Sequence, residues 1–398
     1  MESSWSGFTP TPEMLARPPL SLYIHIPWCI RKCPYCDFNS HESNSPLPEH
    51  EYIEALLEDL AHEFSRFGQN QRELISIFIG GGTPSLFSGD SYRALLHRIS
   101  ELVNFSSKIE ITLEANPGTV EAERFSSYRD AGINRLSLGI QSFNNDCLLK
   151  LGRIHNSEES LQAIEIAKGV GFKNFNLDLM HGLPGQESEQ ALNDLQIAIS
   201  VAPTHISWYQ LTIEPNTAFY RYPPQLPHEA ILEKIQEDGQ NLLESHGYVQ
   251  YEVSAFAKNG FTSLHNHNYW SFGDYLGVGA GAHGKLTLPN ENKLIRIRKQ
   301  KQPNSYLQGQ ARREAELKDI PKQERTVEFL MNALRLKDGF NQIQFESRTG
   351  LAFSVISKRV EYQIENGLMQ RTEKDGEEFF STTTTGYRFL NSVLEEFL

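Results

Sequence analysis

Cysteine, basic charge and long apolar runs are scarce in this sequence of 398 residues, and each scarcity excludes a class of protein. Four cysteines are too few for a disulfide-rich secreted scaffold. With 37 Lys and Arg against 50 Asp and Glu, the net charge of −13 disfavours nucleic acid and anionic membranes as partners. No apolar stretch reaches membrane-spanning length, and residues 1–20 show no basic region followed by an apolar run. We therefore expect a cytoplasmic protein with no nucleic-acid partner.

Short β-rich runs alternate with helical segments along the first half of the chain. The runs occupy residues 21–26, 75–79, 109–113, 135–139, 174–180 and 205–212. Between them, stretches such as EYIEALLEDLAHEF and LQAIEIAKGVGF have helical periodicity. These six β/α units predict an α/β fold with a parallel sheet, helices outside it, and ligands at the carboxyl ends of the strands.

Cysteines, glycines or polar residues follow five of the predicted strands. After the first strand come three cysteines within eight residues, CIRKCPYC. After the later strands come the GGGTPS loop at residues 80–85, Glu114 and Gln141, and Asp178 lies near the end of the run at 174–180, in FNLDLMHGLPG. A single glycine or proline loop is ordinary at a strand end, but five such elements at one predicted edge indicate a site.

Three clustered thiols match neither a four-ligand structural zinc site nor a disulfide framework with an even cysteine count. Taken alone, they leave a metal knuckle or a redox switch open. Thiolates also suit iron–sulfur clusters, and three of them can hold three irons of a [4Fe–4S] cluster while the fourth iron stays open. Cys147 stands apart in a helical stretch, where we expect it only to pack.

The C-x3-C-x2-C spacing, followed by the GGGTP loop, resembles the radical S-adenosylmethionine (SAM) superfamily. The resemblance implies a partial (β/α)6 barrel in which Cys29, Cys33 and Cys36 bind a [4Fe–4S] cluster and SAM chelates the open iron. Further positions that it assigns to cofactor binding are Tyr23, Tyr35, Gly81, Gly82, Thr83, Glu114, Gln141, Arg153 and Asp178. A surface salt bridge for Arg153 and simple packing for Tyr35 stay open as alternatives.

Longer strings, such as LGRIH, LDLMHGLPGQ and DYLGVGAGAHGK, resemble the coproporphyrinogen oxidase-like branch from about residue 20 to the end. The anaerobic oxidases of this branch have a further cysteine two residues after the third, where this chain has Phe38. The pattern therefore resembles the HemW heme chaperones. That resemblance implies a protein that binds heme and passes it to acceptors such as respiratory-chain hemoproteins.

The string HNHNYW at residues 265–270 matches the H-N-x-x-Y-W signature associated with heme in that family. The resemblance makes His265 the heme ligand, with Tyr269 and Trp270 offering flat apolar surface to the porphyrin. His267 is the alternative ligand. Related sequences often have a cysteine two residues before the first histidine, and Ser263 excludes a thiolate from that place. A histidine with two aromatic neighbours is otherwise a common packing arrangement.

Two more segments leave alternatives open. The GVGAGAHG string at residues 277–284 either lets the backbone approach adenine or closes the last turns of the barrel by tight packing. The LIRIRKQKQ run at residues 294–302 has the alternating basic residues of a solvated strand face. A weaker reading is that its cations meet porphyrin propionates or an acidic partner.

The expected domain organisation has four parts. They are an N-terminal extension at 1–20, the radical SAM barrel with its HNxxYW segment at 21–290, a polar linker at 291–322, and a small winged-helix-like domain at 323–398. The last part carries more acids than bases, which disfavours DNA binding. The resemblance implies that this domain covers the barrel.

Three candidate functions are compatible with the cysteine motif. A heme chaperone would carry the cluster and SAM without decarboxylating porphyrins, whereas an oxygen-independent coproporphyrinogen III oxidase would use them for radical chemistry. A plain iron–sulfur regulator does not explain the polar residues at the other strand ends. Phe38 and HNHNYW favour the chaperone. Whether the protein is an enzyme, forms a homodimer or associates peripherally with a membrane stays open.

Overall fold

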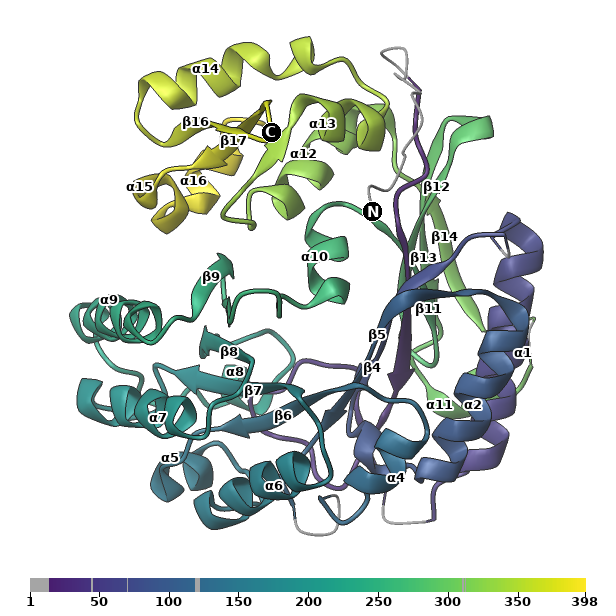
Figure 1. Cartoon of the computed structure of the whole chain (residues 1–398), viewed down its shortest axis with the longest axis vertical. Coiled ribbons are helices and arrows are strands. Elements are labelled where there is room, and N and C mark those ends of the chain that lie inside the picture. The colour runs from purple at the N-terminus through teal and green to yellow at the C-terminus, as the bar shows by residue number, and fades with distance from the viewer. Residues whose placement is uncertain (1–13, 44–45, 70, 119–121, 310, 312) are drawn as a thin grey trace.

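The computed structural model describes residues 14–43, 46–69, 71–118, 122–309, 311 and 313–398. Within them, a 12-stranded sheet runs in the order β14-β13-β12-β11-β1-β4-β5-β6-β7-β8-β10-β9 (Figure 1). Two smaller sheets accompany it, one of three strands in the C-terminal part and one of two strands beside the cysteines.

The six predicted strands are confirmed as a continuous parallel block. They are β1 (Leu20–Ile26), β4 (Leu74–Gly81), β5 (Phe105–Ala115), β6 (Arg135–Gln141), β7 (Asn174–His181) and β8 (His205–Gln210). Each pairs in parallel with the next. The block does not close on itself, because β1 pairs on its other side with β11 and β8 pairs with β10. The structure is thus a partial (β/α)6 barrel.

Amphipathic helices cover the outer face of this block (Figure 1). They are α1 (Glu49–Phe67), α2 (Gly89–Leu102), α4 (Phe125–Asp130), α5 (Asn145–Lys150), α6 (Ser157–Gly169), α7 (Ser188–Ser200) and α9 (Glu229–Ser245). In α1, Tyr52, Leu56 and Leu60 recur every four residues on the buried side. Gly68 then ends the helix in the left-handed conformation.

The same alternation orients side chains along the strands. In β1, Leu22 and Ile24 are completely buried in the core that the strands share with the helices. Tyr23 and His25 alternate with them and therefore point to the opposite, inner face of the sheet. Functional side chains of the parallel strands must project from this inner face or from the strand ends.

Six more strands extend the sheet at both edges, where β11 runs parallel to β1 and the other added pairs are antiparallel. They are β9 (Val249–Glu252), β10 (Ala255–Ala257), β11 (Asp274–Val278), β12 (His283–Leu288), β13 (Lys293–Lys299) and β14 (Glu314–Asp319). The segment 291–322, expected as a polar linker, contains the regular strands β13 and β14. The edge strand β14 is almost entirely exposed, so its composition is polar like that of a loop.

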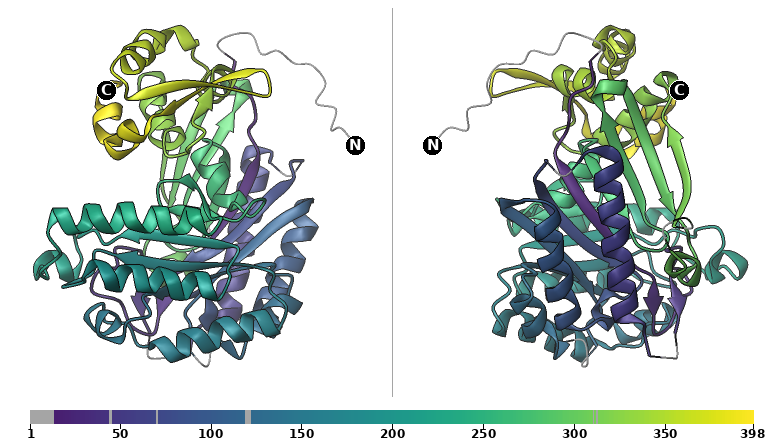
Figure 2. Two further views of the ribbon diagram at one scale, coloured as in Figure 1. Left: turned by 60° about the vertical axis from the view of Figure 1, so that its left-hand side comes forward. Right: turned by 90° about the vertical axis from the view of Figure 1, so that its right-hand side faces the viewer.

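The C-terminal part forms a group of helices with a hairpin at one end of the molecule (Figure 2), and it has its own small core. Its elements are α12 (Lys322–Ala333), β15 (Phe340–Asn341), α13 (Gln342–Thr349), α14 (Ser357–Glu365), β16 (Met369–Lys374), β17 (Glu377–Thr382), α15 (Thr384–Arg388) and α16 (Leu390–Glu395). Phe329 packs edge-on against Phe340 and Phe345. Helices followed by the β16–β17 hairpin confirm the winged-helix-like outline.

The described part of the N-terminal extension runs along this C-terminal core. Leu15 is buried in it, and the Ala16 N–H donates to the Ser347 carbonyl over 2.9 Å. Residues 1–13 lie outside the described part of the chain.

Short elements complete the fold. They are β2 (Trp28–Cys29), β3 (His41–Glu42), α8 (Ala218–Arg221), α10 (Leu264–Trp270), α11 (Pro303–Leu307) and 3-10 turns at Pro84–Leu86, Pro289–Glu291 and Phe353–Val355. Among the helices of the described residues, none is both long and apolar enough to cross a membrane.

Candidate functional site

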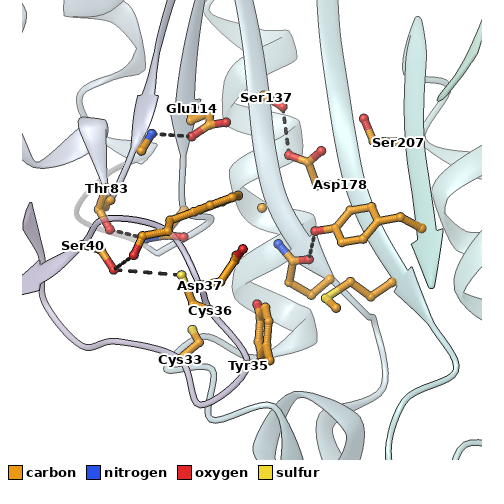
Figure 3. A pocket seen from close by; sticks show the side chains of 18 of the residues that line it. Cys33, Tyr35, Cys36, Asp37, Ser40, Thr83, Glu114, Ser137, Asp178 and Ser207 are labelled. Carbon is orange, nitrogen blue, oxygen red and sulfur yellow. Dashed lines mark hydrogen bonds between the residues drawn. The ribbon is translucent and has the colours of Figure 1, made fainter. Parts of the chain in front are cut away.

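A cavity of about 660 Å³ opens at the carboxyl ends of the parallel strands (Figure 3). The residues named from the sequence that line it are Cys29, Cys33, Cys36, Tyr35, Gly81, Gly82, Thr83, Glu114, Gln141, Arg153 and Asp178. Tyr23 and His265 are not among its lining residues. Strand ends far apart in the sequence therefore meet at one site, as expected for a parallel sheet.

The three cysteines lie on one wall of the cavity, and all are free thiols. Their loop is anchored from both sides. His25 Nε2 lies 2.8 Å from the carbonyl oxygen of Asn39, and Asn39 Nδ2 donates to the Ala280 carbonyl over 2.9 Å. Burial raises the pKa of the Cys29 and Cys36 thiols, so an electropositive ligand is needed to favour their thiolates.

This set of thiols fits a [4Fe–4S] cluster, because the three sulfurs would bind three different irons. Within the described residues, no three His, Cys, Asp or Glu side chains are grouped to hold a single metal ion. A cluster does not require the sulfurs to converge on one point. Three free thiols facing a shared cavity are therefore compatible with it.

The GGGTP loop packs flat against the chain that follows β1. A Cβ atom on Gly82 would lie 2.5 Å from the Trp28 carbonyl oxygen, and Gly81 has a φ of 117°. The Gly82 and Thr83 N–H groups donate to the carbonyls of Ile26 and Trp28 over 2.8 and 2.7 Å. Since these donors are already used, the loop can offer carbonyl oxygens to an ammonium group.

Two carboxyl groups face the inner side of the cavity. Glu114 Oε2 accepts from the Gly81 N–H over 3.0 Å, and burial, reinforced by the charge of Asp178, raises the pKa of Glu114 to about 8. Asp178 accepts from Ser137 Oγ and Asn176 Nδ2, each over 2.8 Å. Burial also raises the pKa of Asp178. Both groups are placed to accept hydrogen bonds from a ligand.

Gln141 and Asn116 organise the middle of the site. Gln141 has a φ of 69°, which turns the chain at the end of β6, and its Oε1 accepts from the Tyr209 hydroxyl over 2.8 Å. Asn116 Nδ2 donates to Thr83 Oγ1 over 3.3 Å, and its Oδ1 accepts from Arg153 over 2.8 Å. Asn116 therefore links the glycine loop to the arginine.

Arg153 is directed toward the cysteine loop rather than into a surface salt bridge. It donates to the Gly139 carbonyl over 2.8 Å, and its Nη1 lies 3.5 Å from Cys33 Sγ. Its buried Nε has no hydrogen-bond partner among the described residues. Tyr35 lines the cavity and also packs against Phe219, with ring centroids 6.4 Å apart. A role in cofactor binding and a role in packing are therefore compatible for this residue.

His265 lies behind the cavity, in the interior of the barrel. Its Nδ1 is 3.1 Å from Ser76 Oγ, and its ring lies 5.1 Å from Phe78 and 6.4 Å from Tyr23, measured between centroids. Burial lowers the pKa of His265 to about 3, which keeps the imidazole neutral. His265, which the resemblance makes the heme ligand, is thus a buried residue with 7% of its surface exposed.

Helix α10 instead presents Asn266 and Trp270 to the cavity. Ser263, which replaces the cysteine of related sequences, caps the helix by accepting from the Asn266 N–H over 3.4 Å. His267 is exposed, with Nδ1 3.2 Å from Ser271 Oγ. The aromatic end of the HNHNYW string therefore reaches the site, whereas neither histidine lines it.

Two open alternatives can now be compared with their surroundings. A Cβ on Gly279 would lie 3.0 Å from the Tyr52 hydroxyl, and one on Gly281 would clash with Asn39, which favours tight packing for GVGAGAHG. In the basic run, Arg298 pairs with Glu316 over 3.3 Å, and Lys299 is buried against Asp59 and Glu63. These cations already have acidic partners within the protein.

Sequence reasoning missed several cavity residues. Asn116 lies in the ANPG string directly after β5, so its place at a strand end was a usable signal. Tyr209 lacked this signal, because the strand was predicted to run from 205 to 212, whereas β8 ends at Gln210. Glu252 and Arg335 had none, because they come from the sheet edge and the C-terminal domain and meet only in the folded chain.

Comparison with known proteins agrees with this geometry. Residues 23–197 match the radical SAM superfamily. The heme chaperone HemW of Haemophilus influenzae is 53% identical over 96% of this chain and 98% of its own length. The heme chaperone HemW of Escherichia coli is 47% identical over 97% of this chain and 100% of its own.

Among solved structures, the radical SAM enzyme coproporphyrinogen III oxidase (HemN) from Escherichia coli has a TM-score of 0.78 and 22% identity. The match covers 96% of this chain and 90% of that one, and at this identity it establishes the shared fold alone. The near-full-length relatives are much closer in sequence. The chain therefore belongs to the HemW family of radical SAM proteins.

Proposed function

We propose that this protein is a heme chaperone that carries a [4Fe–4S] cluster and SAM. The observation that carries the proposal is Phe38, which lines the cavity two residues after Cys36. The anaerobic oxidases of the wider branch have a further cysteine there. The names of the near-full-length relatives support the same reading. The fold does not separate the two functions, because the solved oxidase shares it.

In this proposal, Cys29, Cys33 and Cys36 hold the cluster. Bound there, a [4Fe–4S] cluster supplies redox capacity and one iron that is open to the amino and carboxylate groups of SAM. Arg153 is placed to pair with the SAM carboxylate, since its Nε still lacks a partner in the described chain. The glycine-loop carbonyls and Glu114 serve the ammonium group, and Asp178 serves hydroxyl groups.

Replacing either carboxylate tests the SAM site. We expect Asp178→Ala and Glu114→Ala to weaken SAM binding by about 1–3 kcal/mol each, because ligand donors lose their buried acceptor. Calorimetry on cluster-loaded protein measures the change. Glu165→Ala is the matched control, since Glu165 is an exposed acid on α6 that pairs with Lys168 over 2.8 Å. Unchanged affinity in both cavity variants would remove these residues from the SAM site.

We propose that helix α10 supplies the axial heme ligand. His267 is exposed, whereas His265 is packed behind Phe78, so ligation by His265 requires a displacement of α10. Heme titration followed by absorption spectroscopy, at an expected ratio of about one heme per chain, compares His265→Ala with His267→Ala. The variant with the altered heme spectrum identifies the ligand. Spectra unchanged in both variants would exclude α10 as its source.

The proposed partners follow from the same function. Acceptors would be heme-free hemoproteins, such as those of the respiratory chain, met in the cytoplasm. Homodimerisation and peripheral membrane association stay as proposals to be measured on the heme-loaded protein.

A further inference from the structure

The cavity has a second end, at the seam between the barrel and the C-terminal domain. It is lined there by Glu252, Ser254, Asn266, Trp270 and Arg335. These residues come from β9, from the turn after it, from α10 and from the segment that follows α12. Figure 1 shows α10 between the barrel and the C-terminal domain. We call these five residues the seam end.

Backbone contacts hold Arg335 at this position. Leu336 forms an antiparallel bridge with Glu252, and the Lys337 N–H donates to the Tyr251 carbonyl over 3.0 Å. The Tyr387 hydroxyl donates to the Arg335 carbonyl over 2.8 Å. The C-terminal domain therefore contributes one fixed cationic side chain to a cavity that otherwise belongs to the barrel.

The polar groups at the seam end are incompletely paired. The Arg335 guanidinium lies 4.3 Å from the Trp270 ring centroid, and its Nη2 is 3.7 Å from Glu252 Oε2, longer than a hydrogen bond. Within the described residues, Arg335 Nε, Trp270 Nε1 and Glu252 Oε2 are buried without hydrogen-bond partners. Native proteins pair most buried polar groups, so the two unpaired donors, Arg335 Nε and Trp270 Nε1, indicate a missing acceptor.

We propose that the seam end binds a carboxylate of a tetrapyrrole, with Arg335 and the Trp270 indole N–H as donors. This inference rests on the proposed heme function and specifies where a propionate is held. A guanidinium suits a carboxylate because its N–H groups can donate in parallel. Glu252 positions Arg335, and burial raises the pKa of the Glu252 carboxyl, which reduces its repulsion of an incoming anion.

Other cations also line the cavity and must be distinguished. Arg31 and Lys32 belong to the cysteine loop, and the Lys32 ammonium donates to the Phe38 carbonyl over 3.0 Å. Arg153 lies at the cluster end, 3.5 Å from Cys33 Sγ. A test of the seam end must therefore change Arg335 while leaving these three cations in place.

The test compares heme with its dimethyl ester, which keeps the ring and iron but has no carboxylate. Affinities are measured by titration of cluster-loaded full-length protein. We expect wild type to prefer heme by about tenfold or more, and Arg335→Ala to lose most of that preference. Arg371→Ala is the control, because Arg371 is on the same domain and pairs at the surface with Glu361 and Glu378. The control should keep the preference.

Trp270→Phe provides an independent variant should Arg335→Ala fail to fold. It keeps an aromatic ring under the guanidinium and removes only the indole donor, so the preference should fall several-fold. If both variants keep the wild-type preference, the seam end does not bind the carboxylate. Equal affinity of wild type for heme and ester also overturns this inference while leaving the chaperone proposal intact. Failure of wild type to bind either compound refutes the proposed function itself.

Discussion

Access to the cavity distinguishes the cysteines of this protein from one another. Cys33 and Cys36 face a cavity, whereas Cys147 lies on α5 and packs against Leu151 and Met180. Burial raises the pKa of the Cys147 thiol to about 11, which keeps it protonated and inert near neutral pH. The same amino acid thus lines the cavity in one place and only packs in the other.

Cluster content should separate these two kinds of cysteine. We expect about four irons and four sulfides per chain after anaerobic reconstitution, and loss of the cluster in Cys29→Ala, Cys33→Ala or Cys36→Ala. Cys147→Ala should retain it, because this thiol does not line the cavity. Iron and sulfide analysis measures both. A cluster that depended equally on Cys147 would have four thiolate ligands and no open iron.

Glu114 predicts a pH dependence of stability. Its pKa is raised from an ordinary 4.5 to about 8, so the folded chain keeps a proton that the unfolded chain releases in this interval. The stabilisation is therefore fully present below the unfolded pKa and is lost as pH rises through the folded pKa. The Glu114→Gln variant should not lose stability in this way, because the amide of glutamine does not titrate.

Denaturant unfolding of cluster-free protein should show the difference. Between about pH 5 and about pH 8, the unfolding free energy of Glu114→Gln should rise relative to wild type by roughly 1 kcal/mol or more. A difference that stays constant over this range would mean that Glu114 is ionised normally in the folded protein.

At the scale of elements, the glycine loop after β4 and the helix α6 contain glycines with opposite roles. A Cβ on Gly82 would meet the Trp28 carbonyl at 2.5 Å, whereas one on Gly169 would meet nothing within 4 Å. We expect Gly82→Ala to destabilise the fold by about 1–3 kcal/mol through displaced backbone. Gly169→Ala, in a helix, should stabilise it by about 0.5–1 kcal/mol. Urea unfolding gives both values, and equal effects would contradict the packing described for the loop.

Elements with a clear pattern of apolar residues were predictable from the sequence. Elements that depend on contacts with residues distant in the sequence were not. The six parallel strands follow from buried β-rich runs such as β4 and β7. The strand β14 was missed, because an exposed edge strand needs only one neighbour and carries no apolar alternation. The burial of His265 on α10 was not predictable either, since periodicity does not specify which side of a seven-residue helix faces a cavity.

At the scale of the whole molecule, the barrel and the C-terminal domain both contribute side chains to the cavity. The barrel supplies the cysteines and the carboxyl groups, and the C-terminal domain adds Arg335 at the seam. The open sheet makes this arrangement possible, because β9 and β10 extend the barrel edge toward the C-terminal domain. The cysteine end of the cavity could be predicted from the cysteine spacing, whereas the seam end depends on contacts between residues more than 80 positions apart, such as Glu252 and Arg335.

The most direct test of the chaperone proposal supplies both candidate substrates to one preparation. Anaerobically reconstituted protein with SAM and reductant receives coproporphyrinogen III, and a heme-loaded sample is mixed with a heme-free acceptor hemoprotein. We predict that heme moves to the acceptor while coproporphyrinogen III remains unchanged, because Phe38 occupies the place of the oxidases' further cysteine. Sustained conversion to protoporphyrinogen IX, without heme transfer, would contradict the proposal and assign the cavity to the oxidase reaction.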